Sequence, residues 1–112
     1  MTTIWHNPRC SKSRATLAIV EDHGPLEIRK YLEDAPSEAE IRDVLDQLGV
    51  PAIQLMRTGE AEFKELGLSK TDSDEVLIAA MAKAPKLIER PVVITGKGVR
   101  LGRPPESVKD IL

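Results

Sequence analysis

The only cysteine of the 112-residue chain, Cys10, lies in the segment HNPRCSKSR at residues 6–14. The basic side chains nearest to it in sequence are those of His6, Arg9, Lys12 and Arg14. The thiolate is the nucleophilic form of cysteine, and nearby positive charge lowers the pKa of a thiol. These residue types therefore predict an activated thiolate beside an anion site. The alternative is an inert cysteine in the core, because free cysteine is among the most buried residue types.

The elements on either side of Cys10 favour the reactive interpretation. Residues 2–6 (TTIWH) are β-branched and aromatic and predict a strand, which Asn7-Pro8 ends. Apolar residues recur at near-helical spacing over 11–23, and Gly24-Pro25 ends that pattern. Cys10 is thus expected at a helix N-terminus, where exposed backbone N–H groups stabilise negative charge and form an anion site. Ser11 and Ser13 could equally serve as helix caps.

The spacing around Cys10 argues against two familiar cysteine chemistries. A dithiol oxidoreductase needs Cys-x-x-Cys, but the second position here is Ser13. A resolving thiol must then come from another molecule. A cysteine phosphatase loop has Cys-x5-Arg, whereas Arg14 comes too early and position 16 is threonine.

Three further arginines lie in apolar or proline-bounded settings, in the segments LMRTG (Arg57), IERPVVI (Arg90) and LGRPPE (Arg103). The planar guanidinium suits oxyanions, although a surface arginine is more often only solvated. Arg90 precedes Pro91, which opens a predicted strand, and such a bond can be cis.

The order of the predicted elements is β-α-β, several helices, then β-β-α. The first and second strands, at 2–6 and 26–32, are expected to be parallel, with a right-handed crossover. Ser37 and Glu40 form a capping box for a helix closed by Gly49, with Ile41, Val44, Leu45 and Leu48 on its apolar face. Further elements are expected after Pro51 to about Met56, over 60–67, and over 72–84, where Val76, Leu77, Ala80 and Met81 share a face. The chain then predicts strands at 91–95 and 99–102, and a short helix at 106–112.

Length and composition limit the class of protein. A chain of 112 residues is expected to form a single domain, 1–112, with a helical insertion at about 37–84. The net charge of −2 and three aromatic residues favour neither nucleic acid nor a membrane as a partner. One cysteine and two histidines cannot supply a usual zinc site, so no metal is expected. The start of the chain lacks signal-peptide features, and a lone cysteine fits a reducing compartment, so we expect a cytoplasmic protein.

The chain resembles the glutathione/glutaredoxin-linked arsenate reductases almost from end to end. The segments that carry the resemblance are IWHNPRCSKSR, LMRTGE and LIERPVVITGKGVRLGRPPESVKDIL, in that order. The resemblance implies an α/β, thioredoxin-like fold: a mixed four-stranded sheet with a helical insertion. It also implies reduction of arsenate to arsenite, as part of arsenic detoxification. Glutathione would be the co-substrate and glutaredoxin the partner, with no tightly bound cofactor. A monomer is expected.

The same resemblance implies roles for individual residues. Cys10 would be the nucleophile that forms a thiol-arsenate adduct. Arg57, Arg90 and Arg103 match oxyanion-binding arginines, and Pro91 matches the structural cis-proline. Thiolate-stabilising positions are matched by His6, Ser13 and Arg14. Lys12 departs from the pattern, because well-studied members carry smaller, uncharged residues between the cysteine and the serine.

Two alternatives come from other functional classes. A Spx-like regulator that binds RNA polymerase has the same fold but usually carries Cys-x-x-Cys, which Ser13 contradicts. A glutathione-dependent thiol transferase would need Cys10 but not the three arginines.

Overall fold

The computed structural model describes residues 1–112, which pack as two compact units. The sheet unit comprises Met1–Asp34 and Arg90–Leu112, and the helical unit comprises Ala35–Glu89. That the chain forms a single domain, with a helical insertion at about 37–84, stays a prediction.

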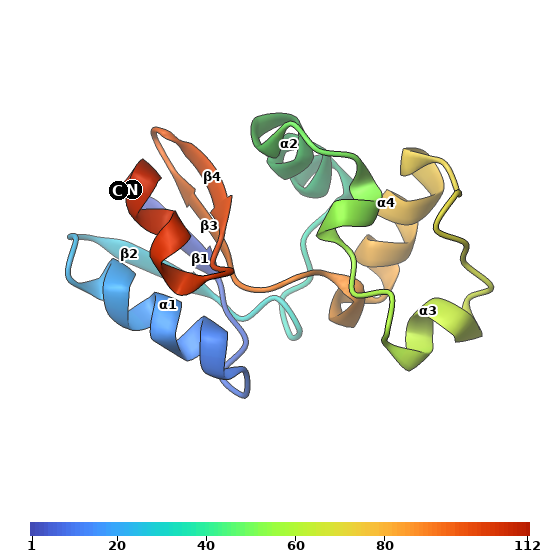
Figure 1. Cartoon of the computed structure of the whole chain (residues 1–112), viewed down its shortest axis with the longest axis horizontal. Coiled ribbons are helices and arrows are strands. Elements are labelled where there is room, and N and C mark those ends of the chain that lie inside the picture. Colours follow the sequence, from blue (N-terminus) through green and yellow to red (C-terminus); the bar gives the residue numbers. More distant parts are fainter. The chain divides into compact units, whose positions relative to one another are not determined.

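The sheet unit is built on a mixed four-stranded sheet (Figure 1). Its strands are β1 (Thr2–Trp5), β2 (Leu26–Arg29), β3 (Val92–Thr95) and β4 (Gly98–Leu101). Their order is β2-β1-β3-β4, with β1 parallel to β2 and the other pairs antiparallel. The predicted fold class is confirmed, including the parallel first pair.

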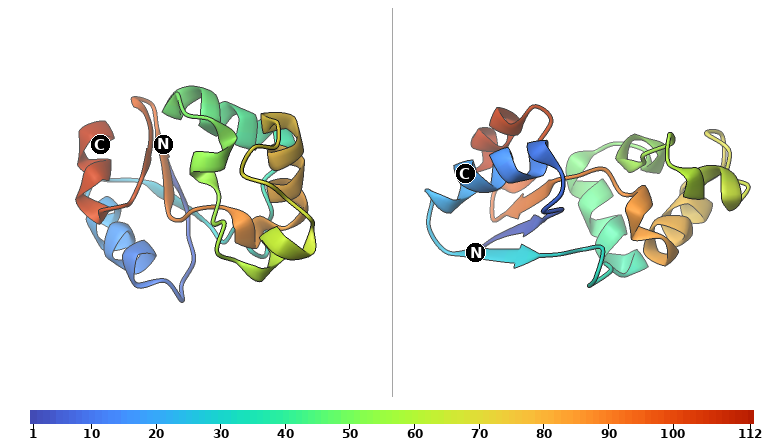
Figure 2. Two further views of the ribbon diagram at one scale, coloured as in Figure 1. Left: turned by 45° about the vertical axis from the view of Figure 1, so that its right-hand side comes forward. Right: turned by 90° about the horizontal axis from the view of Figure 1, so that it is seen from below.

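Helix α1 (Ser11–Glu21) and the 3₁₀ helix η3 (Pro105–Ile111) lie together on one face of this sheet, as the two views of Figure 2 show. The core between these layers is aliphatic and comprises Ile4, Val20, Val93, Val108 and Ile111. Burying one such side chain stabilises the folded state by about 1.5–3 kcal/mol. The packing fixes α1 on the sheet and therefore fixes the loop that precedes it.

The most buried residues of α1 are not the alanines of the apolar pattern over 11–23. Ser13, Thr16 and Val20 are buried, whereas Ala15 and Ala18 are exposed. The two polar residues tolerate burial because both have hydrogen-bond partners: Thr16 Oγ1 donates to the Lys12 carbonyl, and Ser13 bonds within the preceding loop. Ser13 is therefore a buried core residue, and Cys10 itself occupies the N-cap position.

Strand β2 is shorter than predicted, ending at Arg29 where the sequence suggested residue 32. The chain turns directly afterwards, since the backbone N–H groups of Glu33 and Asp34 both donate to the Lys30 carbonyl. Tyr31 is fully buried within this turn. Tyr31 thus packs in the core from a turn rather than from a longer strand.

The helical unit contains α2 (Glu38–Leu48), η1 (Ala52–Leu55), α3 (Ala61–Glu65), α4 (Asp74–Lys83) and η2 (Pro85–Leu87). The predicted capping box at α2 is present in both directions, and Gly49 closes the helix with a φ of 69°. Helix α2 packs against α4, which also contacts η1 and η2. None of the helices is both long and apolar enough to cross a membrane.

The prediction that Val76 lies on the buried face of its helix was wrong. Helix α4 begins later than expected, because Ser73 is the N-cap and its hydroxyl accepts from the Val76 N–H. Val76 lies in the first turn and its side chain is 47% exposed. Ile78 is buried in its place, together with Leu77, Ala80 and Met81.

Candidate functional site

Cys10 lies at the N-cap of α1, at the end of the loop that leaves β1. Its backbone is extended (φ −96°, ψ 123°) and its carbonyl accepts the first helical hydrogen bond from the Arg14 N–H at 3.0 Å. The Cys10 N–H donates to the Asn7 carbonyl, also at 3.0 Å, which closes the Asn7-Pro8-Arg9 turn. The side chain is half-buried and forms no disulfide. The thiol therefore meets the backbone N–H groups of the first helical turn.

The pKa of the Cys10 thiol is lowered. Burial of the sulfur acts in the opposite direction, but it is outweighed by the backbone N–H of Ser13, the charge of Arg90, the backbone N–H of Lys12 and a hydrogen bond from Arg90. Each of these groups favours the charged form over the neutral thiol. A thiolate at a helix N-terminus beside a guanidinium is the arrangement of a reactive cysteine.

His6 and Ser13 form a buried pair behind this loop. Nδ1 of His6 lies 2.7 Å from Oγ of Ser13, and the same Oγ accepts from the Asn7 N–H at 3.0 Å. The pKa of His6 is lowered, first by burial and then by the charges of Lys30 and Arg14, with an opposing contribution from Glu21. The uncharged imidazole is therefore the favoured form at neutral pH. Its contact is with the loop, so it positions the turn that leads to Cys10.

Two further hydrogen bonds hold the loop before Cys10. The Arg14 Nη1 donates to the Pro8 carbonyl at 2.9 Å, and the backbone N–H of Arg9 donates to the side-chain Oδ1 of Asn7 at 3.0 Å. Lys12 is exposed. The only group of Lys12 that contributes to the lowered pKa of Cys10 is its backbone N–H. The turn around Cys10 is thus fixed by several short contacts.

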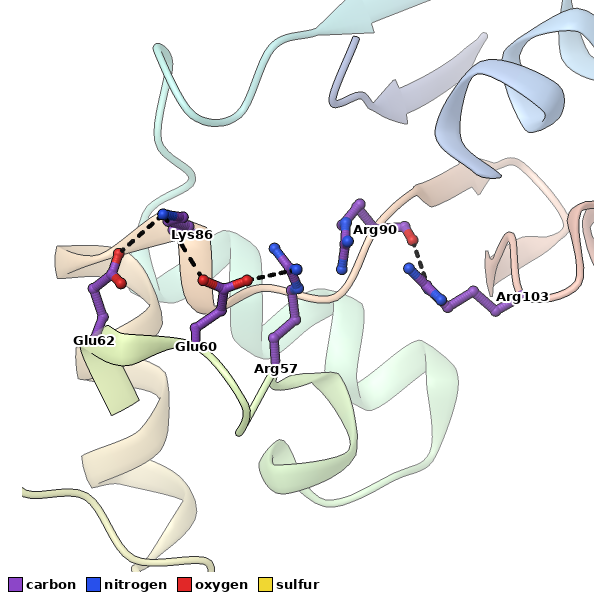
Figure 3. A network of polar contacts seen from close by, with 6 residues as sticks. All are labelled: Arg57, Glu60, Glu62, Lys86, Arg90 and Arg103. Atoms are coloured by element: carbon purple, nitrogen blue, oxygen red, sulfur yellow. Dashed lines mark hydrogen bonds and ion pairs between the residues drawn. The ribbon is translucent and has the colours of Figure 1, made fainter. Parts of the chain in front are cut away.

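Arg90 and Arg103 lie together in the sheet unit. Nε of Arg103 donates to the Arg90 carbonyl at 3.0 Å (Figure 3). The peptide bonds Arg90–Pro91 and Arg103–Pro104 are both cis. Because Arg90 also hydrogen-bonds Cys10, this unit brings together the thiol, Arg90 and Arg103.

Gly102 is a positioning residue that the sequence analysis missed. A Cβ added to it would lie 2.6 Å from Cγ of Pro91 and would also collide with Oγ1 of Thr16. Its N–H donates to the Pro91 carbonyl at 3.0 Å. Only glycine allows α1 and the Arg90–Pro91 segment to approach this closely. The signal in the sequence was a glycine directly before Arg103-Pro104.

Arg57 lies in the helical unit and is already ion-paired. Its Nη2 contacts Oε1 of Glu60 at 2.5 Å, and Nζ of Lys86 lies 3.8 Å from Oε2 of Glu60 and 3.9 Å from Oε2 of Glu62 (Figure 3). The Arg57 N–H donates to the Leu87 carbonyl at 2.7 Å, which holds the backbone next to the isolated bridge between Met56 and Ile88. Sequence analysis missed Glu60, although its spacing of three residues from Arg57 was visible.

The ArsC family matches residues 5–111 of the chain. The chain belongs to the ArsC family. An arsenate reductase of Haemophilus influenzae is 43% identical over 113 residues, covering 97% of both chains. The Escherichia coli K12 protein named "Uncharacterized protein YfgD" is 47% identical over 112 residues, covering 97% of this chain and 94% of the other.

The solved structures agree with the family. The arsenate reductase of Vibrio cholerae superposes with a TM-score of 0.92 at 48% identity, over 99% of this chain and 97% of the other. The four-stranded mixed sheet of this ArsC chain is therefore the thioredoxin-like fold of the family, as predicted. The roles that the resemblance implies for individual site residues stay predictions.

Proposed function

We propose that this ArsC family member is an oxidoreductase that reduces arsenate to arsenite through a single nucleophile, Cys10, as a step in arsenic detoxification. The observation that carries the proposal is the position of Cys10 at the N-terminus of α1 and beside Arg90, where the helix N–H groups and the guanidinium lower the pKa of the thiol. Glutathione and glutaredoxin supply the reducing thiols from outside, because Ser13 occupies the place of a second cysteine.

In the first step the Cys10 thiolate attacks the arsenic atom of arsenate. An S–As bond forms and one As–O bond breaks, with the departing oxygen leaving as water after protonation. Arsenic remains in its +5 state at this stage. Arg90 and Arg103 are the cations of the sheet unit that would neutralise the charge of the oxyanion, because guanidinium groups bind such oxygens in pairs. Arg57 would contribute a third cation, a role that rests on the family resemblance.

In the second step a glutathione thiolate attacks the sulfur of Cys10. A disulfide forms between Cys10 and glutathione, the S–As bond breaks, and its electron pair remains on arsenic, which becomes arsenite in the +3 state. A glutaredoxin thiolate then attacks the glutathione sulfur and releases the Cys10 thiolate. The two electrons thus come from one glutathione and one glutaredoxin thiol. A glutathione-dependent cycle fits a cytoplasmic protein, and we propose that it acts as a monomer.

The deciding experiment is a coupled assay with arsenate, glutathione, glutaredoxin and an NADPH-driven system that recycles glutathione. We expect arsenate-dependent NADPH consumption, and we expect Cys10→Ser to reduce it to the background rate because the nucleophile is lost. Circular dichroism would show that the variant is folded. An inactive, well-folded wild-type protein would refute arsenate as substrate. Exchange with glutathione mixed disulfides in that case would favour the thiol transferase instead.

A further inference from the structure

A cavity of about 290 Å³ lies in the sheet unit, next to the loop that carries Cys10. One wall is the segment from His6 to Arg9, which leads directly into Cys10, and the other is formed by Lys30, Leu32 and Glu33 after β2. These two segments follow neighbouring parallel strands (Figure 1), so the fold itself brings them together. The steps proposed above leave this cavity without a role.

The charged side chains of the cavity have no partners within the chain. Arg9, Lys30 and Glu33 are exposed, and their side chains take part in no hydrogen bond or ion pair. Leu32 between them is 42% exposed, which is high for a leucine. The cavity therefore offers two cationic groups, one carboxylate and an apolar contact to a ligand.

The ligand that fits this set is a small peptide with two carboxylates and one ammonium group. The guanidinium of Arg9 and the ammonium of Lys30 suit the two carboxylates, and the carboxylate of Glu33 suits the ammonium. Such a peptide is glutathione, whose central cysteine would have to extend beyond the cavity to the sulfur of Cys10, the residue that follows Arg9.

We propose that this cavity binds glutathione and directs its sulfur to Cys10, with Arg9 and Lys30 holding the two carboxylates and Glu33 the ammonium. The proposal rests on glutathione being the reductant in the proposed function, and it adds the site at which that reductant binds. Specificity for glutathione would then be separate from specificity for the oxyanion, because Arg90 and Arg103 do not line this cavity.

The test uses thiol-disulfide exchange, which requires no arsenate. The Cys10 thiolate attacks glutathione disulfide, forming the Cys10-glutathione disulfide and releasing one glutathione thiolate, and mass spectrometry follows the product. Each rate is divided by the fraction of Cys10 thiolate, measured by ultraviolet absorbance. In the double variant Arg9→Glu/Lys30→Glu, we expect this rate to fall by about tenfold, since two attractive contacts become repulsive.

Two other disulfides control for the reactivity of Cys10. The neutral bis(2-hydroxyethyl) disulfide should react with the double variant and the wild type at equal rates. Cystamine, which carries two ammonium groups, should react faster with the double variant. Lys109→Glu makes the same charge change at an exposed position of η3 outside the cavity, and it should leave all three rates unchanged. Equal losses with charged and neutral disulfides, or no loss with glutathione disulfide, would overturn the proposal.

The arsenate assay separates this inference from the proposed function. In an active enzyme the double variant should raise the KM for glutathione by about tenfold and leave the KM for arsenate unchanged. If the wild type fails to reduce arsenate but still selects glutathione disulfide through Arg9 and Lys30, the proposed function fails and the glutathione site stands. If it reduces arsenate without this selectivity, the site is wrong and the proposed function stands.

Discussion

The two regions that carry the predicted anion-handling residues differ in their electrostatic state. Around Cys10, the backbone N–H groups of Ser13 and Lys12 and the guanidinium of Arg90 all favour a negative charge. Around Arg57, the cation is already paired with the carboxylate of Glu60, which also lies near Lys86. The first region stabilises the thiolate of Cys10, whereas in the second region the carboxylate of Glu60 already neutralises the charge of Arg57.

This difference shows that residues with the same predicted role can start from different states. An oxyanion that approaches Arg57 has to compete with Glu60, and Lys86 is placed to take over that carboxylate. Arg90 instead acts on the nucleophile before any substrate arrives. Arg90 therefore lowers the pKa of Cys10 without a substrate, whereas Arg57 has to leave Glu60 before it can bind an oxyanion.

The largest effect is expected for Arg90→Gln, which removes the activating cation. The pKa of Cys10 should rise, because the variant loses both the charge and the hydrogen bond of Arg90. A hydrogen bond to a charged group contributes about 1.5–3 kcal/mol. Alkylation of Cys10 at neutral pH should therefore slow by about ten- to a hundredfold. Arg100→Gln, at an exposed arginine of β4, is the control and should titrate like the wild type. An unchanged thiol titration in Arg90→Gln would remove the distinction between the two regions.

A second prediction compares the packing of the two regions through their glycines. Gly102→Ala should destabilise the protein by about 1–3 kcal/mol, because its new Cβ would overlap Pro91 and Thr16. Gly59→Ala, between Arg57 and Glu60, meets no atom within 4 Å and should change stability by less than about 0.5 kcal/mol. Chemical denaturation measures both. Equal effects would show that the Cys10 region is not the more tightly packed one.

Much of this architecture could be predicted from the sequence because its signals are local. The capping box of Ser37 and Glu40, the parallel β-α-β start and the position of Cys10 before α1 all follow from neighbouring residues. The buried face of α1 could not, because Ser13 and Thr16 are polar. Their burial depends on partners in the folded structure, which are His6 and Asn7 for Ser13 and the Lys12 carbonyl for Thr16.

The site shows the same division. The sequence predicted Cys10 and the basic residues around it, and it marked Arg90 through the following proline. It did not distinguish the side chain of Lys12, which is exposed, from its backbone N–H, which acts on Cys10. Nor did it indicate the close approach at Gly102 or the cavity wall at Lys30, since both depend on segments far apart in sequence.

A third prediction concerns pH and is specific to the Cys10 region. The lowered pKa of His6 means that the unfolded chain binds a proton at a higher pH than the folded one. Folding stability should therefore fall as the pH drops below about 6.5, the ordinary histidine value, towards the pKa of the folded state. Denaturation at several pH values should show this slope. His6→Gln should flatten it, and His23→Gln, at an exposed position, should not. A slope that persists in His6→Gln would assign it to other groups.

The smallest effect is expected for Glu60→Gln, which breaks the pairing that defines the second region. With the carboxylate neutralised, Arg57 should bind an oxyanion without competition, and the KM for arsenate should fall by about two- to fivefold, the range of a partly exposed ion pair. The matched control is Glu62→Gln, which removes the same charge from a residue that contacts Lys86 but is not paired with Arg57. Its KM should stay within experimental error of the wild type. An equal decrease in both variants would mean that the net charge, and not the release of Arg57 from Glu60, governs the KM for arsenate. The pairing of Arg57 with Glu60 would then not distinguish the two regions.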